Sequence, residues 1–369
     1  MTKQLATMPA YRHAFLHPGE RIDRRTTSLG LYGPEGGVLP DTAIVTSSWT
    51  TRPHSLAPAS GPGAAPLLFG PALFAGSVDK QFGFVLLNSL GRLWALDGLP
   101  VQTTLVFAAK PQAKPPDHAI VAAILRALGL HHPILITETA MRFESLHTAE
   151  ERFGECRGGT GTAQFYDWID SRWPAPTKPD PERKIYVTRT GLGPQAGRYA
   201  CEDHLEALLQ AEGYTIYRPE AHDIRHQVQT FQTAGKLIFA EGSALHLFAL
   251  IRRPGQISAV IQRRTALPAV MTAQMADRAG AATVAINAVS AEWWPPRRGD
   301  HLGLSVLDFP HLRDRLADLG LIRGTNWITP TEAQVQASLA AGLAPGDTLM
   351  TTGQRADWLK TQREARRKG

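Results

Sequence analysis

Residues 183–264 have the most regular hydrophobic pattern in the chain, because two periodicities alternate along them. Short β-rich runs, beginning with residues 184–189 (KIYVTR), are separated by segments in which apolar residues recur at helical spacing. The first of these segments, residues 202–212, starts with acidic residues, which the helix dipole favours, and Gly213 follows it. The pattern predicts consecutive βα units.

The alternation continues beyond the first unit. It predicts strands at 214–218, 236–240, 257–261 and 282–286, and helices at 224–231, from 244, at 266–279 and at 310–319. Strands joined through helices of this length need right-handed crossovers and form a parallel, doubly wound sheet. Ligands of such sheets bind at the carboxyl ends of the strands, so we expect the functional site there.

The first half of the chain shows a less regular α/β pattern. It predicts strands at 41–46, 67–74, 102–109 and 133–137, a loop at 55–66, and helices at 79–96, 117–128 and 161–172. Four prolines in the stretch PAPTKPDP, which starts at residue 174, predict a stiff, extended connector. We therefore expect an N-terminal α/β domain at 1–173, a linker at 174–182, a second α/β domain at 183–329 and a helical tail at 330–369.

Composition indicates an ordinary soluble protein. Of its 369 residues 43% are hydrophobic and 20% are charged, which excludes a fibrous or disordered chain. Two cysteines, Cys156 and Cys201, are too few for a disulfide framework and are typical of a reducing cytosol. Neither a long apolar run nor the apolar core of a signal peptide occurs, so we expect a cytoplasmic protein.

The net charge of +6 is a modest excess of 39 basic over 33 acidic residues. The densest basic run is residues 363–368 (REARRK) in the tail. Three interpretations of that run are a solvated helix, peripheral contact with an anionic membrane surface such as the inner membrane, and nucleic-acid binding, in decreasing order of preference. No nucleic-acid partner is therefore expected, whereas a phosphate-bearing ligand suits the positive excess.

Small residues in the turn 241–245 (EGSAL) connect a predicted strand to a predicted helix. Such a helix start binds phosphate through its N–H groups and dipole, although a tight structural turn needs the same residues. Arg189 ends another strand of the same predicted sheet, and therefore lies at the same edge. An arginine there can hold a diphosphate bidentately.

Signatures of other enzyme classes are absent from the sequence. No P-loop, G-x-G-x-x-G after a strand, G-x-S-x-G or Asp-x-Asp pair occurs, so we expect no bound metal and no cofactor. His222 and His226 stand four residues apart on a predicted helix, but no third ligand is placed near them in sequence. A solvated helix face is the favoured interpretation of that pair.

Five short motifs follow one another between residues 183 and 250: YVTR, an acidic helix start, G-Y-x-I-x-x-P-E, H-Q-V-x-x-F-x-x-A and E-G-S-A-L-H. In this order and spacing they resemble the donor half of bacterial family 61 glycosyltransferases, which are often labelled capsular polysaccharide biosynthesis proteins. A weaker match over residues 81–94 extends the resemblance to most of the chain.

This resemblance implies a GT-B fold, in which two Rossmann-like, doubly wound domains face each other across a cleft. It implies that a nucleotide-sugar donor, bound mainly by the second domain, passes its sugar to a glycan or glycolipid acceptor with inversion and without a metal. Arg189 is then expected at the diphosphate. The residues that the resemblance assigns to the donor are Arg189, Glu220, Gln227, Glu241, Gly242, Ser243, Ala244, Leu245 and His246.

Three positions depart from the family pattern, two of them in the first half. Family members commonly carry His-Phe-x-x-Glu where this chain has Phe84 and Asn88, and Cys201 replaces an asparagine before Glu202. The nearest alternative for a general base is Asp79, whose other interpretation is capping of its helix. Two hypotheses follow, an inverting glycosyltransferase and a catalytically impaired nucleotide- or glycan-binding protein that kept the fold.

Overall fold

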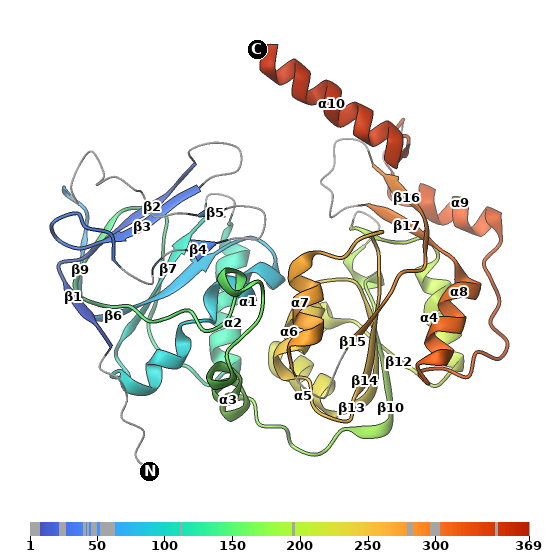
Figure 1. Cartoon of the computed structure of the whole chain (residues 1–369), viewed down its shortest axis with the longest axis horizontal. Helices are drawn as coiled ribbons and strands as arrows, with labels where there is room; N and C mark the ends of the chain where they lie inside the picture. The colour runs from blue at the N-terminus through green and yellow to red at the C-terminus, as the bar shows by residue number, and fades with distance from the viewer. Residues whose placement is uncertain are drawn as a thin grey trace. The chain divides into compact units, whose positions relative to one another are not determined.

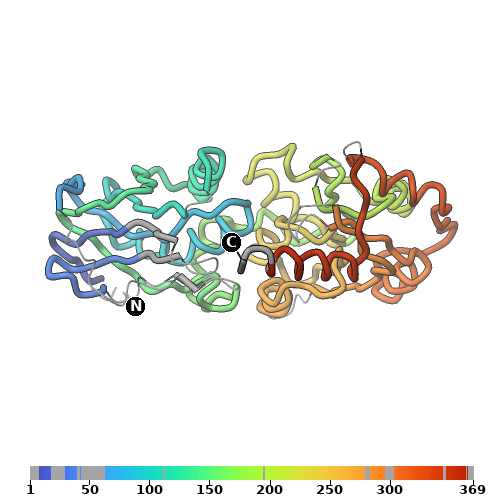
Figure 2. Tube along the Cα trace, turned by 90° about the horizontal axis from the view of Figure 1, so that it is seen from above, coloured from blue at the N-terminus to red at the C-terminus, as the bar shows by residue number. Residues whose placement is uncertain are grey.

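The computed structural model describes residues 8–368 except 22–26, 40–41, 43, 46–49, 52–62, 111–112, 194–195, 279–282, 296–302 and 344–345. The chain forms two compact units. The first contains residues 1–174, 246–251 and 269–277, and the second contains 175–245, 252–268 and 278–369. Figures 1 and 2 follow the chain in two views, from blue at the N-terminus to red at the C-terminus.

The first unit is built on a mixed sheet. Its strands are β1 (Ala10–Arg12), β2 (Phe15–Arg21), β3 (Thr27–Tyr32), β6 (Leu67–Val78), β7 (Thr104–Ala109), β8 (Ile134–Thr137) and β9 (Met141–His147). In the order β3-β2-β9-β6-β7-β8, the neighbours from β9 to β8 run parallel, whereas β1 and β2 pair with β9, and β3 with β2, antiparallel. The predicted strands at 67–74, 102–109 and 133–137 are confirmed, and the other four were not predicted.

Two further predictions concern the N-terminal region. A strand was predicted at 41–46, and the structure has a two-residue strand there, β4 (Ile44–Val45), paired with β5 (Thr50–Thr51). The loop predicted at 55–66 lies mostly outside the described residues.

The helices of the first half are α1 (Phe82–Ser89), the 3-10 helix η1 (Leu93–Gly98), α2 (Pro115–Ala127) and α3 (Ala163–Arg172). The prediction of one helix over 79–96 is therefore wrong. The helix begins late because Gln81 has a φ of 76°, outside the helical range. It ends early because Gly91 packs against the backbone at Phe153, so the chain turns before η1.

The second unit contains a fully parallel five-stranded sheet, as the βα pattern predicted. Its strands are β10 (Asp180–Val187), β12 (Thr215–Tyr217), β13 (Ala234–Ala240), β14 (Ile257–Ile261) and β15 (Thr283–Ile286), in the order β12-β10-β13-β14-β15. Strand β10 starts inside the stretch predicted as a linker, because Asp180 pairs with Ala234. The order reverses between β10 and β13, which makes that point the topological switch of the sheet.

Helices cover both faces of this sheet. Helices α4 (Glu202–Ala211) and α8 (Phe309–Asp318) pack their leucines on one face in a shared apolar core with Ile238 and Ala259. On the other face, α5 (Ile224–Thr233) places the Phe231 ring 5.5 Å from that of Phe239. Along the chain, α6 (Ala244–Ile251) follows β13 and α7 (Ala269–Asp277) follows β14, as the βα pattern predicted, although residues 246–251 and 269–277 belong to the first unit.

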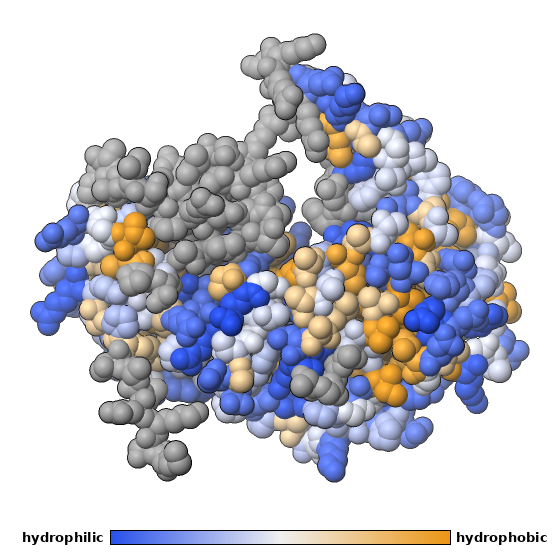
Figure 3. Space-filling view, viewed as in Figure 1, coloured by the Kyte–Doolittle hydropathy of each residue, from blue (hydrophilic) through white to orange (hydrophobic). Residues whose placement is uncertain are grey.

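A second, four-stranded sheet was not predicted. It contains β11 (Arg198–Tyr199), β16 (Val289–Trp294), β17 (Leu304–Leu307) and β18 (Met350–Thr351), in the order β11-β17-β16-β18. The region predicted as a helical tail contains α9 (Glu332–Ala340) and α10 (Thr352–Lys368), with β18 between them. The coloured residues of α10 are mainly hydrophilic in Figure 3. Among the helices of the described residues, none is both long and apolar enough to cross a membrane.

Replacement of Gly235 should destabilise the second unit. A Cβ atom there would overlap the carbonyl of Asp180 and lie 2.6 Å from the Cα of Pro181. Because both neighbours are backbone, the strands must separate, and we expect Gly235→Ala to lower the free energy of unfolding in urea by about 1–3 kcal/mol. Gly353→Ala is the control, since nothing lies within 4 Å of its Cβ position. Equal stability of both variants would contradict the close strand contact.

Candidate functional site

The candidate site lies at the switch point of the parallel sheet. Strands β10 and β13 are neighbours, and Arg189 follows the first of them while Gly242 follows the second. At such a point the connections leave the sheet in opposite directions, which is where doubly wound sheets bind their ligands. The predicted residues Arg189 and Gly242 are therefore brought together by the topology.

The Arg189 side chain is held in one orientation. Its Nε donates to the carbonyl of Gly197 at 3.0 Å, and its guanidinium group lies over Gly242. A Cβ atom on Gly242 would overlap Nη1 and lie 3.5 Å from Cδ and Cζ, so the guanidinium needs a glycine below it. Within the described residues, the hydrogen bonds of Arg189 use its backbone N–H and Nε. Both Nη atoms remain for a ligand.

Two further arginines follow the neighbouring strand β14, and the sequence did not single them out. The carboxylate of Glu241 is fully buried and accepts hydrogen bonds from the backbone N–H of Arg263 at 2.8 Å and from Nε of Arg264 at 2.6 Å. Nη2 of Arg264 also contacts Glu241. Glu241 was assigned to the donor, but both of its oxygens are engaged by these arginines.

Arg263 is buried with part of its guanidinium unpaired. It is 4% exposed, and its Nη1 donates to the carbonyl of Gly303 at 3.1 Å. Its Nε has no hydrogen-bond partner within the described part of the chain. Burial, and then the positive charge of Arg189, lower the pKa of Arg263 to about 10. The arginine is still protonated at neutral pH. A bound anion would therefore offset the unfavourable effects of burial and of the Arg189 charge on the Arg263 guanidinium.

The backbone that carries these groups is fixed by buried hydrogen bonds. The hydroxyl of Tyr199 donates to the carbonyl of Ile261 at 2.5 Å and accepts the N–H of Glu241 at 3.0 Å, so it joins the ends of β13 and β14. Burial raises the pKa of Tyr199 well above its ordinary value, and the hydroxyl stays protonated. The hydroxyl of Ser305 donates to the Arg263 carbonyl. The arginines are thus held before any ligand arrives.

The predicted phosphate turn has the expected form. Residues Gly242 and Ser243 separate β13 from α6, which starts at Ala244, and the N–H of Leu245 donates to the Gly242 carbonyl at 3.2 Å. The first N–H groups of a helix have no partner inside it, so this turn presents donors beside Arg189.

Glu220 and Gln227 lie near the end of β12. Glu220 is exposed in the 3-10 helix η4 (Pro219–Ala221), and its carboxylate packs against Gly191. Gln227 is buried, and its Nε2 donates to the carbonyls of Pro219 at 2.8 Å and His222 at 3.0 Å. Gln227 therefore fixes the loop that carries Glu220.

His222 and His226 stack on each other, with ring centroids 4.3 Å apart, and both are exposed. The hydroxyl of Tyr217 lies 3.0 Å from Nδ1 of His226. No group of three or more metal-binding side chains occurs among the residues that the structure describes.

His246 is grouped with the first unit. Its ring is 6% exposed and lies against Gly83 of α1, and its Nδ1 is 2.5 Å from Oε1 of Gln274 on α7. An amide oxygen can only accept, so Nδ1 carries the proton. Burial lowers the pKa of His246. The histidine is a neutral, buried group whose donor role stays a prediction.

Asp79 follows β6 in the first unit and does not cap a helix. Its Oδ2 pairs with Nζ of Lys110 at 3.1 Å, and its Oδ1 accepts the N–H of Lys80 at 2.8 Å. The capping interpretation is wrong, because α1 begins at Phe82 and has no side-chain cap.

Asn88 on α1 is 2% exposed, and neither of its amide atoms has a partner among the described residues.

The chain matches the family model for glycosyltransferase 61 over residues 42–257, more than half of its length. It belongs to the glycosyltransferase 61 family. This family 61 chain is therefore an enzyme that transfers a sugar from a donor to an acceptor. A search of the curated proteins finds no match.

The matched range of this family 61 transferase contains Asp79, Arg189 and the 241–245 turn. It ends at the first residue of β14, before Arg263 and Arg264. Those two arginines follow a correctly predicted strand, so a search for basic residues at every strand end would have found them.

The buried His246 should make stability depend on pH. Because its pKa is lowered from an ordinary value of 6.5, the unfolded chain takes up a proton first as the pH falls. Below pH 6.5 the parent should lose up to about 1.4 kcal/mol of unfolding free energy per pH unit, until the folded pKa is reached. His246→Asn keeps an N–H for Gln274 and should lose less. Identical urea midpoints of parent and variant from pH 8 to pH 5 would argue against a buried neutral ring.

Proposed function

We propose that this family 61 transferase takes its sugar from a nucleotide-sugar donor, whose diphosphate binds between Arg189, Arg263 and the 242–245 turn. The observation that carries this proposal is the buried guanidinium of Arg263, whose Nε has no hydrogen-bond partner among the described residues. Arg189 and Arg264 lie near it, and the buried carboxylate of Glu241 bonds the backbone N–H of Arg263 and the guanidinium of Arg264. A diphosphate supplies the missing negative charge and enough oxygens for the free N–H groups.

The proposed reaction is a single displacement. A base removes the proton from an acceptor hydroxyl while the oxygen of that hydroxyl forms a bond to the anomeric carbon of the donor sugar. At the same time, the bond between the anomeric carbon and the diphosphate oxygen breaks. Attack from the opposite side inverts the anomeric centre. The electron pair stays on the diphosphate, where the arginines stabilise the developing charge. These guanidinium groups do what a divalent cation does in other transferases, so we propose a metal-independent reaction without a cofactor.

Asp79 is the proposed base. It is the carboxylate nearest in sequence to the family's His-Phe-x-x-Glu positions, which Phe84 and Asn88 occupy here. The ion pair with Lys110 fixes its position. Glu241, in contrast, is proposed to hold Arg263 and Arg264 in place instead of touching the donor.

The proposal also covers the domain arrangement, the acceptor, the product and the cellular location. We propose a GT-B arrangement, an acceptor that is a glycan or glycolipid, and a product of the surface or capsular polysaccharide type. Both cysteines are free, in keeping with a cytoplasmic location. We propose that helix α10 contacts an anionic membrane surface by charge, because its sequence (TGQRADWLKTQREARRK) is rich in basic residues and contains few apolar ones.

Loss of either arginine should weaken binding of the diphosphate. Arg189→Ala and Arg263→Met should each cost about 1.5–3 kcal/mol of binding free energy for the tightest of UDP, GDP, CDP and ADP, measured by calorimetry. The matching nucleoside should bind all variants alike, since it carries no phosphate. Arg183→Ala is the control, because that exposed arginine lies near the amino end of β10. Undiminished diphosphate affinity in Arg189→Ala would remove Arg189 from the site.

Asp79→Asn should abolish transfer and leave donor binding intact. Removal of a general base typically slows turnover by about 10²- to 10⁴-fold, whereas nucleoside diphosphate affinity depends on other residues. Asp117→Asn is the control, because that carboxylate accepts the Lys114 N–H and caps α2. Transfer from a panel of nucleotide sugars is measured for all three proteins. Full activity of Asp79→Asn would exclude it as the base, and an inactive parent that still binds nucleotide would favour the binding-protein alternative.

A further inference from the structure

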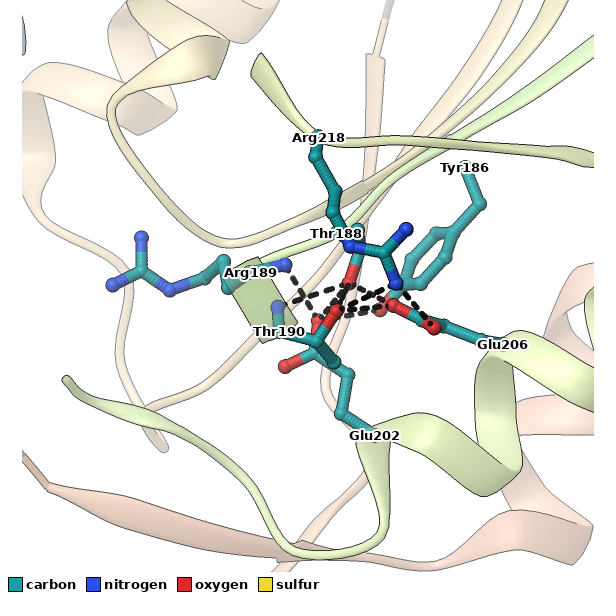
Figure 4. Close-up of polar contacts among 7 residues, drawn as sticks. All are labelled: Tyr186, Thr188, Arg189, Thr190, Glu202, Glu206 and Arg218. Carbon is teal, nitrogen blue, oxygen red and sulfur yellow. Dashed lines mark hydrogen bonds and ion pairs between the residues drawn. The ribbon is translucent and has the colours of Figure 1, made fainter. Parts of the chain in front are cut away.

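Two carboxylates on helix α4 lie beneath the turn that carries Arg189. Glu202 and Glu206 are one helical turn apart and therefore share a face of α4. Their side chains converge on residues 188–190, where β10 has ended and the chain turns (Figure 4). We propose that they are positioning residues, which fix Arg189 for the diphosphate without neutralising it. This inference rests on the proposed function, because it concerns the same diphosphate.

Glu202 holds the backbone of Arg189. Its Oε1 accepts the Arg189 N–H at 2.9 Å and also bonds the hydroxyls of Thr188 at 3.0 Å and Tyr186 at 3.1 Å. The φ and ψ of Arg189 are −120° and 2°, so its N–H has left the parallel ladder and needs another acceptor. Glu202 is 4% exposed, so its carboxylate is largely shielded from solvent. The carboxylate thus determines where the chain turns.

Glu206 completes the support from the next turn of α4. Its Oε1 lies 2.7 Å from the Thr188 hydroxyl and 2.5 Å from the Thr190 hydroxyl. Its Oε2 forms an ion pair with Nη2 of Arg218 at 3.1 Å. Residues 188, 189 and 190 are therefore all tied to the same face of one helix.

The Arg189 side chain points away from the two glutamates that hold its backbone. An arginine beside two carboxylates would ordinarily pair with one of them. Here Glu202 bonds the backbone N–H of Arg189 but not its guanidinium, Glu206 is paired with Arg218, and the Arg189 guanidinium points away from both carboxylates (Figure 4). It extends instead over Gly242 at the phosphate turn. The two glutamates therefore orient a cation whose charge remains available to an anion.

Burial also raises the pKa of Glu202, so a neutral side chain of the same shape is tolerated there. Glutamine keeps an oxygen that can accept the Arg189 N–H, whereas alanine removes the acceptor of that N–H and of the buried Tyr186 hydroxyl. Comparison of Glu202→Gln with Glu202→Ala therefore distinguishes the hydrogen bond that positions Arg189 from the negative charge of Glu202.

The test measures affinity for the tightest of UDP, GDP, CDP and ADP, and for its nucleoside, by calorimetry. Glu202→Ala should weaken diphosphate binding about tenfold or more, and Glu202→Gln should remain within about threefold of the parent. Nucleoside affinity should not change in either variant, which a general loss of structure would not reproduce. Glu202→Asp, with the carboxylate one methylene short, should also weaken the diphosphate, and it replaces Glu202→Ala if that variant does not fold.

Glu212→Gln is the matched control. Glu212 is another buried glutamate at the opposite end of α4, where it accepts the N–H groups of Arg323 and Gly324 at 2.9 and 2.8 Å. This variant should keep parental diphosphate affinity even if it unfolds more easily.

The Arg189→Ala variant distinguishes failure of the positioning role of Glu202 from failure of the proposed diphosphate site. If Arg189→Ala weakens diphosphate binding but Glu202→Ala and Glu202→Asp bind it like the parent, the positioning role is overturned and the proposed function stands. If Arg189→Ala has no effect, both fail. Equal losses of diphosphate and nucleoside in Glu202→Ala would also overturn the positioning role, because they would indicate a structural defect alone.

Discussion

The guanidinium of Arg263 is buried at the carboxyl edge of the parallel sheet, and none of the described carboxylates forms a hydrogen bond with it. Arg263 is buried next to Arg189, and the one fully buried carboxylate, Glu241, bonds to Arg264 and to backbone. Like charges in a site of low polarity repel strongly, so such an arrangement is held together only by rigid surroundings or by an anion. The protein provides rigid surroundings for the arginines, and we propose that the anion is the diphosphate of the donor.

Rigidity comes from residues that never need to touch a ligand. Tyr199 joins the ends of β13 and β14, and Glu202 secures the turn after β10. Gly242 leaves the space in which the Arg189 guanidinium lies. Preorganised charge of this kind requires little rearrangement when a leaving group becomes negative, which is the main electrostatic advantage of an enzyme over water.

The sequence predicted the parallel sheet well because its strands are buried on both faces. Runs such as 237–240 (LIFA) are continuously apolar, and the intervening helices have clear periodicity. The missed strands lack that signal: β2 (FLHPGER) contains proline and glycine, and β16 (VSAEWW) is half exposed at most positions. The turn at 241–245 was predicted for a local reason, its small residues at a strand end. Arg263 and Glu202 were missed as site residues because their importance depends on neighbours distant in sequence.

The account is tested most directly by a crystal structure of the protein with the tightest-binding nucleoside diphosphate. The central claim is that Arg189, Arg263 and the neighbouring turn at the switch point form the diphosphate site. We expect phosphate oxygens within hydrogen-bond distance of the Arg189 Nη atoms and of Arg263 Nε, with the N–H groups of residues 243 and 244 as further donors. A diphosphate bound elsewhere on the chain, with these three groups free of phosphate, would contradict the claim.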